Sequence, residues 1–206
     1  PAAGAWGAGR RVYARLDLGG HDVGGADRVV RHALITAAHD GTGSIRVAPV
    51  SVRMFCANQI PGLARGGMTV RHSAGALQGV GRIVERLAEI ANQSGDLWRR
   101  FDTLAQSTAG RAWLGDYFER SAVATLGPDL QRLAATPWRE VDPRDRVRFD
   151  RATVRWRAVV ENFRSRYADM ADRGDGPGGI HPGLAGTRWH ALQAVTEWHE
   201  YAGNAS

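Results

Sequence analysis

The residues best suited to act on a ligand are arginines in a stretch that carries no acidic side chains. Between Gly41 and Val84 the sequence contains no Asp or Glu. A guanidinium group binds phosphate through paired hydrogen bonds, so arginines without competing carboxylates predict a phosphate-binding surface for nucleic acid. The candidate nucleic-acid-binding residues of this window are Arg46, Arg53, Asn58, Arg65, Arg71 and His72.

Two observations limit this interpretation. The arginines have an alternative role, which is to pair with carboxylates elsewhere in the chain, such as Asp17 or Glu85. The window also contains a single aromatic residue, Phe55. Proteins that bind single strands stack bases on aromatic rings, so a stacking mode would need Tyr13 or a tryptophan from a helix.

A second basic zone covers residues 139–166, with nine Arg and five acidic residues. Four of these arginines flank Trp156. The favoured interpretation is a solvated helix face with pairs four residues apart, such as Arg157 with Glu161. A second nucleic-acid contact is the alternative.

The bulk composition agrees with a polyanionic partner. The net charge is +6, and all 27 basic residues are Arg. No apolar run approaches the roughly 20 residues that a membrane-spanning helix needs, so we expect no membrane association. Cys56 is the single cysteine, which excludes an intrachain disulfide and favours a reducing, cytoplasmic location.

Enzymatic chemistry is not indicated near the window. His39 and Asp40 resemble the pair found in metal-dependent phosphohydrolases, but Gly41 follows them and the three residues predict a turn. Cys56 is a conceivable nucleophile with His72 as its base. A lone cysteine on an apolar strand is more often a small core residue.

The histidines near the C-terminus do not predict a metal site, and the closely spaced glycines do not predict a nucleotide-binding loop. His190 and His199 are nine residues apart, which places them on opposite sides of a helix, so they cannot share one metal ion. Gly79 and Gly81 lie in an amphipathic helix without a lysine, unlike a nucleotide-binding loop. We therefore predict no catalytic residue, no metal and no cofactor.

Strand patterns dominate the first part of the chain. In residues 10–18, Arg11, Tyr13 and Arg15 alternate with apolar residues, as in a half-buried strand. Gly19-Gly20 and Gly24-Gly25 predict the turn that follows. Pro49 predicts a bulge or an edge position. The expected strands are 10–18, 27–38, 44–56 and 68–72.

Helical patterns follow. Apolar residues at helical spacing predict helices over 77–91, 95–106, 111–124 and 144–170, and Thr187 is expected to cap a last helix. The segment between Gly127 and Pro137 is a short helix or a loop. In the longest helix Phe149 and Phe163 belong to a series of large side chains spaced seven residues apart, which suits packing along one partner helix. A helix of the same chain is the favoured partner, and a homo-oligomer seam is the alternative.

These elements define an α+β fold, with an antiparallel sheet in the N-terminal third backed by several C-terminal helices. Residues 1–73 are expected to be mainly strands and residues 74–206 mainly helices, within a single domain over 1–206.

Four short blocks of the sequence resemble the phage/plasmid-like protein family, also called domain of unknown function 932. The first two blocks are His39-Asp40-Gly41 and the run from Arg53 through Cys56 to Asn58, and the third is Arg71-His72. The last is Gly186-Thr187 with Trp189, although Gln193 stands where the family has Asn. The family-motif residues singled out are His39, Asp40, Gly41, Cys56, Thr187 and Trp189.

The resemblance implies an origin in a mobile element and no settled activity. Family members begin about a hundred residues before Pro1, a length compatible with ordinary domain sizes, so we expect this chain to be the C-terminal part of a longer protein. A sheet followed by a helix is also similar to single-strand annealing proteins, by topology alone. The sequence therefore predicts a non-catalytic phage or plasmid protein that binds single-stranded DNA in recombination or replication. The alternative is an interaction module that assembles through its long helix.

Overall fold

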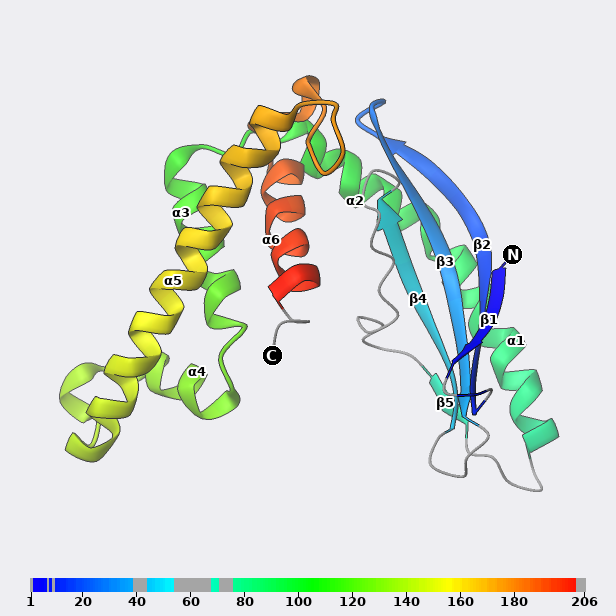
Figure 1. Cartoon of the computed structure of the whole chain (residues 1–206), viewed down its shortest axis with the longest axis horizontal. Coiled ribbons are helices and arrows are strands. Elements are labelled where there is room, and N and C mark those ends of the chain that lie inside the picture. The colour runs from blue at the N-terminus through cyan, green and yellow to red at the C-terminus, as the bar shows by residue number, and fades with distance from the viewer. Residues whose placement is uncertain are drawn as a thin grey trace. The chain divides into compact units, whose positions relative to one another are not determined.

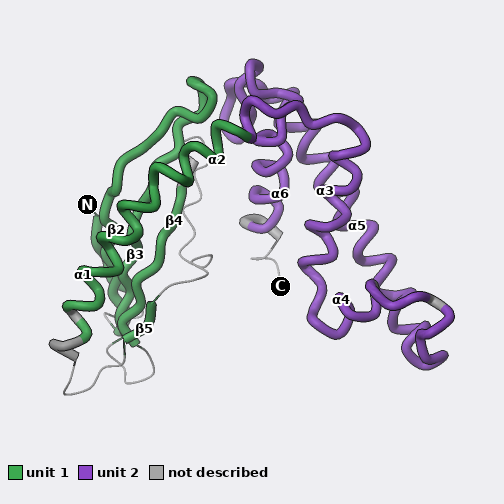
Figure 2. Tube along the Cα trace, turned by 180° about the vertical axis from the view of Figure 1, so that it is seen from behind, with its two compact units in different colours: residues 1–103 green, residues 104–206 purple. Residues whose placement is uncertain are grey.

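The chain divides into two compact units, Pro1–Thr103 and Leu104–Ser206, called unit 1 and unit 2 here (Figure 2). The computed structural model describes residues 2–6, 8, 10–38, 44–53, 68–70 and 76–202. Strands fill the first part and helices the rest, which confirms the α+β class. The single domain over 1–206 stays a prediction, and each unit is described by itself.

Unit 1 contains a five-stranded antiparallel sheet in which neighbours in sequence are neighbours in space (Figure 1). Its strands are β1 Ala2–Trp6, β2 Arg11–Val23, β3 Asp27–Ala38, β4 Ile45–Arg53 and β5 Met68–Val70. The first strand was not predicted, because its Ala and Gly residues show no alternation of apolar and polar side chains. It forms by pairing along β2.

Strand β2 continues past the glycines that were expected to end it. Its register with β3 shifts between Asp17 and Gly20, and Gly19 has a φ of 96°. A carboxylate oxygen of Asp17 accepts a hydrogen bond from the Gly19 N–H at 2.8 Å. The prediction of a turn at Gly19-Gly20 was therefore wrong: these glycines form a β-bulge, and the turn lies at residues 24–26.

Pro49 occupies the edge position that its missing N–H requires. It pairs with Ala33 of β3 in an uninterrupted register. On the other side of β4, strand β5 pairs only with Ile45, Arg46 and Val47, so no described strand lies beside Pro49 there. The connection between β3 and β4, where a His-Asp-Gly turn was predicted, lies outside the described residues.

One face of the sheet is covered by two helices, α1 Ala76–Asn92 and α2 Ser94–Gln106 (Figures 1 and 2). Close packing of α1 on β5 is visible at Gly79, where a Cβ would overlap Cγ1 of Val70. On α2, Asp102 binds His21 Nε2 at 2.8 Å and accepts the Gly24 N–H at 3.1 Å. We call this side of the sheet the helix-covered face.

Unit 2 is built from the remaining helices: α3 Arg111–Val123, α4 Pro128–Ala135, α5 Pro143–Arg173 and α6 Arg188–Ala202. Short 3-10 helices, η2 Trp138–Glu140 and η3 Pro182–Leu184, precede α5 and α6. The segment after Gly127 is thus a short helix, α4.

The core of unit 2 is centred on the side chain of Phe163, which is fully buried. Its ring centroid lies 5.9 Å from that of Phe118 on α3 and 5.3 Å from that of Trp198 on α6. Val160 and Met170 of α5 are also buried. The favoured prediction, that α5 packs against helices of its own chain, is confirmed.

The close approach of α1 to β5 predicts opposite effects for two glycines of one helix. Replacing glycine by alanine inside a helix normally stabilises it by about 0.5–1 kcal/mol. At Gly81 a Cβ meets nothing within 4 Å, so Gly81→Ala is expected to raise the free energy of unfolding by that amount. At Gly79 the overlap with Val70 should outweigh the gain, so Gly79→Ala is expected to destabilise by about 1–3 kcal/mol. Urea unfolding of both variants measures the difference, and equal stabilisation by both would contradict this packing.

Candidate nucleic-acid interface

The face of the sheet opposite α1 and α2 carries a row of paired residues across all five strands, four of which are polar. The pairing register aligns Gly4, Tyr13, Thr36, Arg46 and Thr69, one from each strand. Directly paired residues point to the same side of a sheet, and successive residues to opposite sides. Since Val70 lies under α1, its neighbour Thr69 and the whole row lie on the opposite side, which we call the open face.

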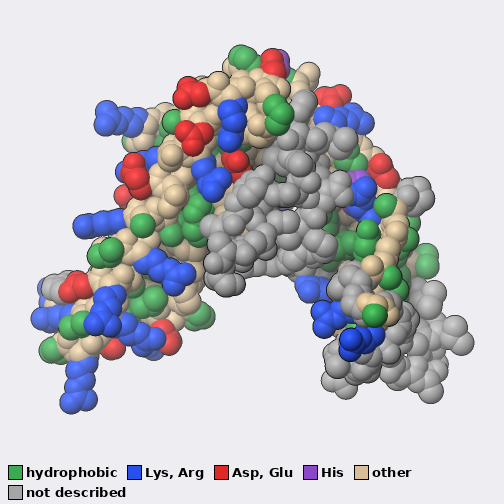
Figure 3. Space-filling model, viewed as in Figure 1, with side chains coloured by type: hydrophobic (Ala, Val, Ile, Leu, Met, Phe, Trp, Pro, Cys, Tyr) green, Lys and Arg blue, Asp and Glu red, His purple; other side chains and the backbone are tan. Residues whose placement is uncertain are grey.

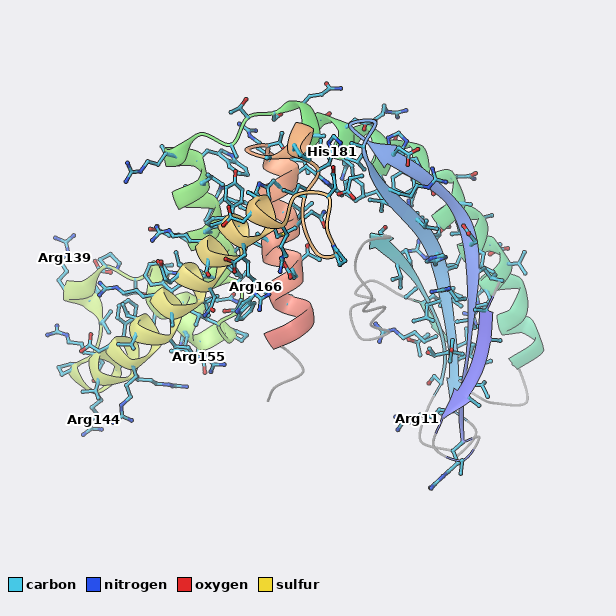
Figure 4. The ribbon with its side chains drawn as sticks, turned by 45° about the horizontal axis from the view of Figure 1, so that its top comes forward. Arg11, Arg139, Arg144, Arg155, Arg166 and His181 are labelled. Atoms are coloured by element: carbon cyan, nitrogen blue, oxygen red, sulfur yellow. The ribbon has the colours of Figure 1, made fainter. Side chains whose placement is uncertain are left out.

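Arginines surround the aromatic member of this row. Arg11 and Arg15 lie two residues before and after Tyr13 on β2, and they therefore share its face. Arg11 and Arg46 are exposed, while Tyr13 and Arg15 are half-buried. Figure 4 labels Arg11 at the start of β2, and Figure 3 shows arginine side chains gathered at that end of the sheet. We call Arg11, Tyr13, Arg15 and Arg46 the basic sheet face.

Gly4 leaves room for the ring of Tyr13 beside β1. A Cβ at Gly4 would be 2.6 Å from Cε1 of Tyr13 and 2.8 Å from its hydroxyl oxygen, too close for any side chain. The two residues are direct partners across the β1–β2 pair. The lack of a side chain at Gly4 therefore sets where an aromatic surface lies among the arginines.

The acidic residues of the open face lie farther along β2. Asp17 is held by the Gly19 N–H of the bulge, and Asp22 pairs with Arg28 at 3.2 Å. The two rows that contain Tyr13 and Arg15 include no carboxylate among their paired positions. Positive charge on the described part of this face is therefore concentrated at the end where β2 begins.

His32 pairs with Asp17 in register and adds no charge to this face at neutral pH. Burial lowers the pKa of His32 below its ordinary 6.5, and the positive charge of Arg15 lowers this pKa further. Its Nδ1 has no hydrogen-bond partner among the described residues. The imidazole is therefore neutral at pH 7.

Two candidate residues of the acid-free window lie on β4, Arg46 and Arg53. Arg46 pairs with Thr36, and the backbone of Arg53 pairs with Val29 at the other end of the strand. Arg46 belongs to the row on the open face, whereas the side chain of Arg53 lies outside the described part of the structure.

Most other predicted residues cannot be placed. Those outside the described residues are Asn58, Arg65, Arg71, His72, His39, Asp40, Gly41 and Cys56. Reasoning from the acid-free window missed Arg11 and Arg15, which precede it. Their signal was the alternation in residues 10–18, which had already placed them with Tyr13 on one side of a strand.

Thr187 and Trp189 have structural roles in unit 2. Thr187 caps α6 as predicted: its Oγ1 accepts a hydrogen bond from the His190 N–H at 3.3 Å and donates one to the Leu184 carbonyl at 2.7 Å. Trp189 is buried, with 1% of its surface exposed. Within the described ranges, no group of three or more His, Cys, Asp or Glu residues is arranged to hold a metal ion.

Comparison with known proteins gives a family but no function. Fold and surface together define an α+β protein with a basic, partly aromatic sheet face. The family model described as domain of unknown function (DUF932) matches residues 1–205, and the chain belongs to this family. No curated protein and no solved structure matches it. Across the described helices, none is both long enough and apolar enough to pass through a bilayer.

The lowered pKa of His32 predicts a pH-dependent stability. The unfolded imidazole titrates near pH 6.5 and the folded one below it, so the unfolded state binds more protons as the pH falls. The free energy of unfolding should therefore hold above about pH 7.5 and fall below about pH 6.5, by at most about 1.4 kcal/mol per pH unit, until the folded group also titrates. Denaturant unfolding at several pH values tests this.

The matched variants for this measurement are His32→Gln and His181→Gln, since His181 has a side chain 45% exposed. His32→Gln should remove this part of the pH dependence, and His181→Gln should leave it in place. An unchanged profile in His32→Gln would contradict the assignment.

Proposed function

We propose that this chain binds nucleic acid through its basic sheet face, that single-stranded DNA is the favoured ligand, and that the role is non-catalytic. The observation that carries the proposal is the arrangement of Arg11, Arg15 and Arg46 around Tyr13 on the face of the sheet opposite α1 and α2. Arginine supplies phosphate contacts, and an aromatic ring among them supplies a surface on which a base can stack.

The spacing of these residues suits a short single strand. Arg11 and Arg15 are four residues apart on β2, or about 13 Å, and Arg46 lies two strands from Tyr13, or about 10 Å. Guanidinium groups at these distances reach separate phosphates of one strand while Tyr13 lies between them. A duplex keeps its bases stacked inside, so a stacking ring favours single-stranded ligands.

The biological setting follows from the family resemblance. A phage or plasmid origin would place such a protein in replication or recombination of a mobile element, where single strands are exposed and annealed. A single cysteine fits a reducing cytoplasm.

The alternative was an interaction module that assembles through its long helix. The large side chains spaced seven residues apart on α5 supported this alternative. The buried members of that series, Phe163 and Met170, lie in the core of unit 2. The same spacing is thus explained by packing within the chain, so it no longer favours a homo-oligomer seam.

Removing the three arginines of the basic sheet face should weaken binding. For Arg11→Gln, Arg15→Gln and Arg46→Gln combined, we expect the slope of log K against log salt to become shallower by about 2. Each phosphate that an arginine contacts on a single strand contributes about 0.7 to this slope, and three contacts are lost. Fluorescence anisotropy with a labelled single-stranded oligonucleotide over a salt series measures both affinity and slope.

The matched control removes the same charge from three exposed arginines outside the basic sheet face. Arg99 pairs with Asp96, Arg120 with Asp116 and Arg164 with Glu161. Replacing Arg99, Arg120 and Arg164 by Gln should leave most of the slope intact. Equal loss in both triple variants would mean that net charge alone drives binding.

A second prediction separates stacking from charge. Tyr13→Ala should weaken single-strand binding by about 1–3 kcal/mol at constant salt slope, because it removes a stacking surface without removing a charge. Tyr13→Phe keeps the ring and should bind like the unaltered chain. If Tyr13→Ala binds as tightly as Tyr13→Phe, the ring takes no part in recognition.

A further inference from the structure

Four arginines form a continuous stripe along the first half of α5, in unit 2. Arg144, Arg148, Arg151 and Arg155 follow one another at steps of four, three and four residues. Side chains three and four residues apart lie on the same side of a helix. All four residues are exposed, and Figure 4 labels Arg144 and Arg155 at the two ends of the stripe. We call these residues the α5 stripe.

The core of unit 2 sets the direction in which the stripe faces. Phe163, Val160 and Met170 turn one side of α5 into the core. At 3.6 residues per turn, the stripe lies about a quarter of a turn from that buried side. Val147 and Val154, 58% and 71% exposed, lie on the outward side of the helix next to the stripe. The arginines therefore project from the unit rather than covering its core.

The stripe lacks the carboxylates that neutralise other arginines of the chain. Within the described ranges no ion pair is formed by Arg144, Arg151 or Arg155, and Arg148 reaches only Asp129 at 3.9 Å. Asp145 lies three residues before Arg148, about a sixth of a turn from it, but the two form no ion pair among the described residues; Asp150 lies more than a quarter of a turn from each arginine of the stripe.

Other arginines on α5 or just before it do form ion pairs with neighbouring carboxylates. Glu161, expected from sequence to pair with Arg157, contacts Arg164 at 3.3 Å. Just before α5, Arg139 contacts Glu140 at 3.7 Å. Figure 3 shows the excess of arginine over acidic side chains on this part of unit 2. Four exposed like charges along one helix face repel one another, and a polyanion relieves that repulsion.

We propose that the α5 stripe is a second phosphate-binding surface, which holds the backbone of the nucleic acid independently of the basic sheet face. The ligand class rests on the proposed function. From Arg144 to Arg155 the helix rises about 16 Å, a length over which one strand of a duplex carries about five phosphates. Four guanidinium groups match that charge density, and the stripe offers no aromatic ring. It therefore reads no base and binds single strands and duplexes alike.

Other occupants fit the described surface less well. A membrane-surface helix inserts a broad apolar side, but that side of α5 is buried in the core, and two valines expose little apolar area. A protein interface is centred on aromatic or large apolar residues, and the outward side of this helix segment offers no aromatic residue and only the two valines among the described residues. Phosphate is the ligand for which arginine alone suffices.

The test compares the full chain with a stripe variant, Arg144→Gln, Arg148→Gln, Arg151→Gln and Arg155→Gln. Anisotropy with a labelled single strand and a labelled duplex, each over a salt series, should show slopes shallower by about 3 and 3.5 respectively. At about 100 mM salt we expect at least tenfold weaker binding of both ligands, since several charge-assisted contacts are lost. Circular dichroism melts check that the variant folds, which exposed positions should permit.

A matched control removes four charges from paired, exposed arginines: Arg99, Arg120, Arg139 and Arg164 to Gln. This control should retain most of the salt slope. A stripe variant whose slopes equal those of the control would overturn the proposal. So would a stripe variant that binds oligonucleotides normally but no longer binds vesicles containing phosphatidylserine, because the stripe would then be a membrane surface.

The variants distinguish a failure of the proposal for the basic sheet face from a failure of the proposal for the α5 stripe. If the triple variant of the basic sheet face no longer binds and the stripe variant binds normally, the proposal for the α5 stripe is wrong and the proposed function stands. If only the stripe variant loses binding, the proposal for the basic sheet face is wrong and the proposal for the α5 stripe stands. If the unaltered chain binds neither oligonucleotide at low salt, both are overturned.

Discussion

The packing of α1 on the sheet is the interaction on which the open face depends. Because Val70 and Gly79 meet without room for another carbon, one side of the sheet is committed to the helices. A sheet with one buried face has a strongly specified register, since a slip by one residue would turn every side chain over. That register places Arg11, Tyr13, Arg15 and Arg46 together on the other side. The basic face is thus a consequence of which side the helices cover.

Unit 2 follows the same logic with a helix in place of a sheet. Burial of Phe163 between Phe118 and Trp198 fixes the rotation of α5 about its axis. Once that rotation is fixed, the direction in which the arginines of the α5 stripe project is also fixed, because they are three or four residues apart. In both units an apolar contact determines where charge is presented, although the charged residues make no part of the core.

The sequence predicted the elements with strong periodicity and missed those that depend on pairing. The long helix and its intrachain partners follow from large side chains every seven residues, and the strand over 27–38 from its branched apolar residues. Strand β1 has no pattern of its own, and Gly19-Gly20 look like a turn until pairing with β3 reveals a bulge. An acid-free window selects Arg46 but omits Arg11 and Arg15, because it counts charge along the chain and not across paired strands. The rows that bring β2 and β4 arginines together exist only after the strands pair.

The central claim is that nucleic acid lies on the open face of unit 1. The most direct test is a titration of the isotopically labelled full chain with a short single-stranded oligonucleotide, followed by backbone amide NMR shifts. If nucleic acid binds there, the largest shifts should occur at residues 11–15, at Thr36 and at Arg46, with small shifts along α1. Shifts concentrated on α1 and α2, or binding that leaves residues 11–15 unperturbed, would contradict it.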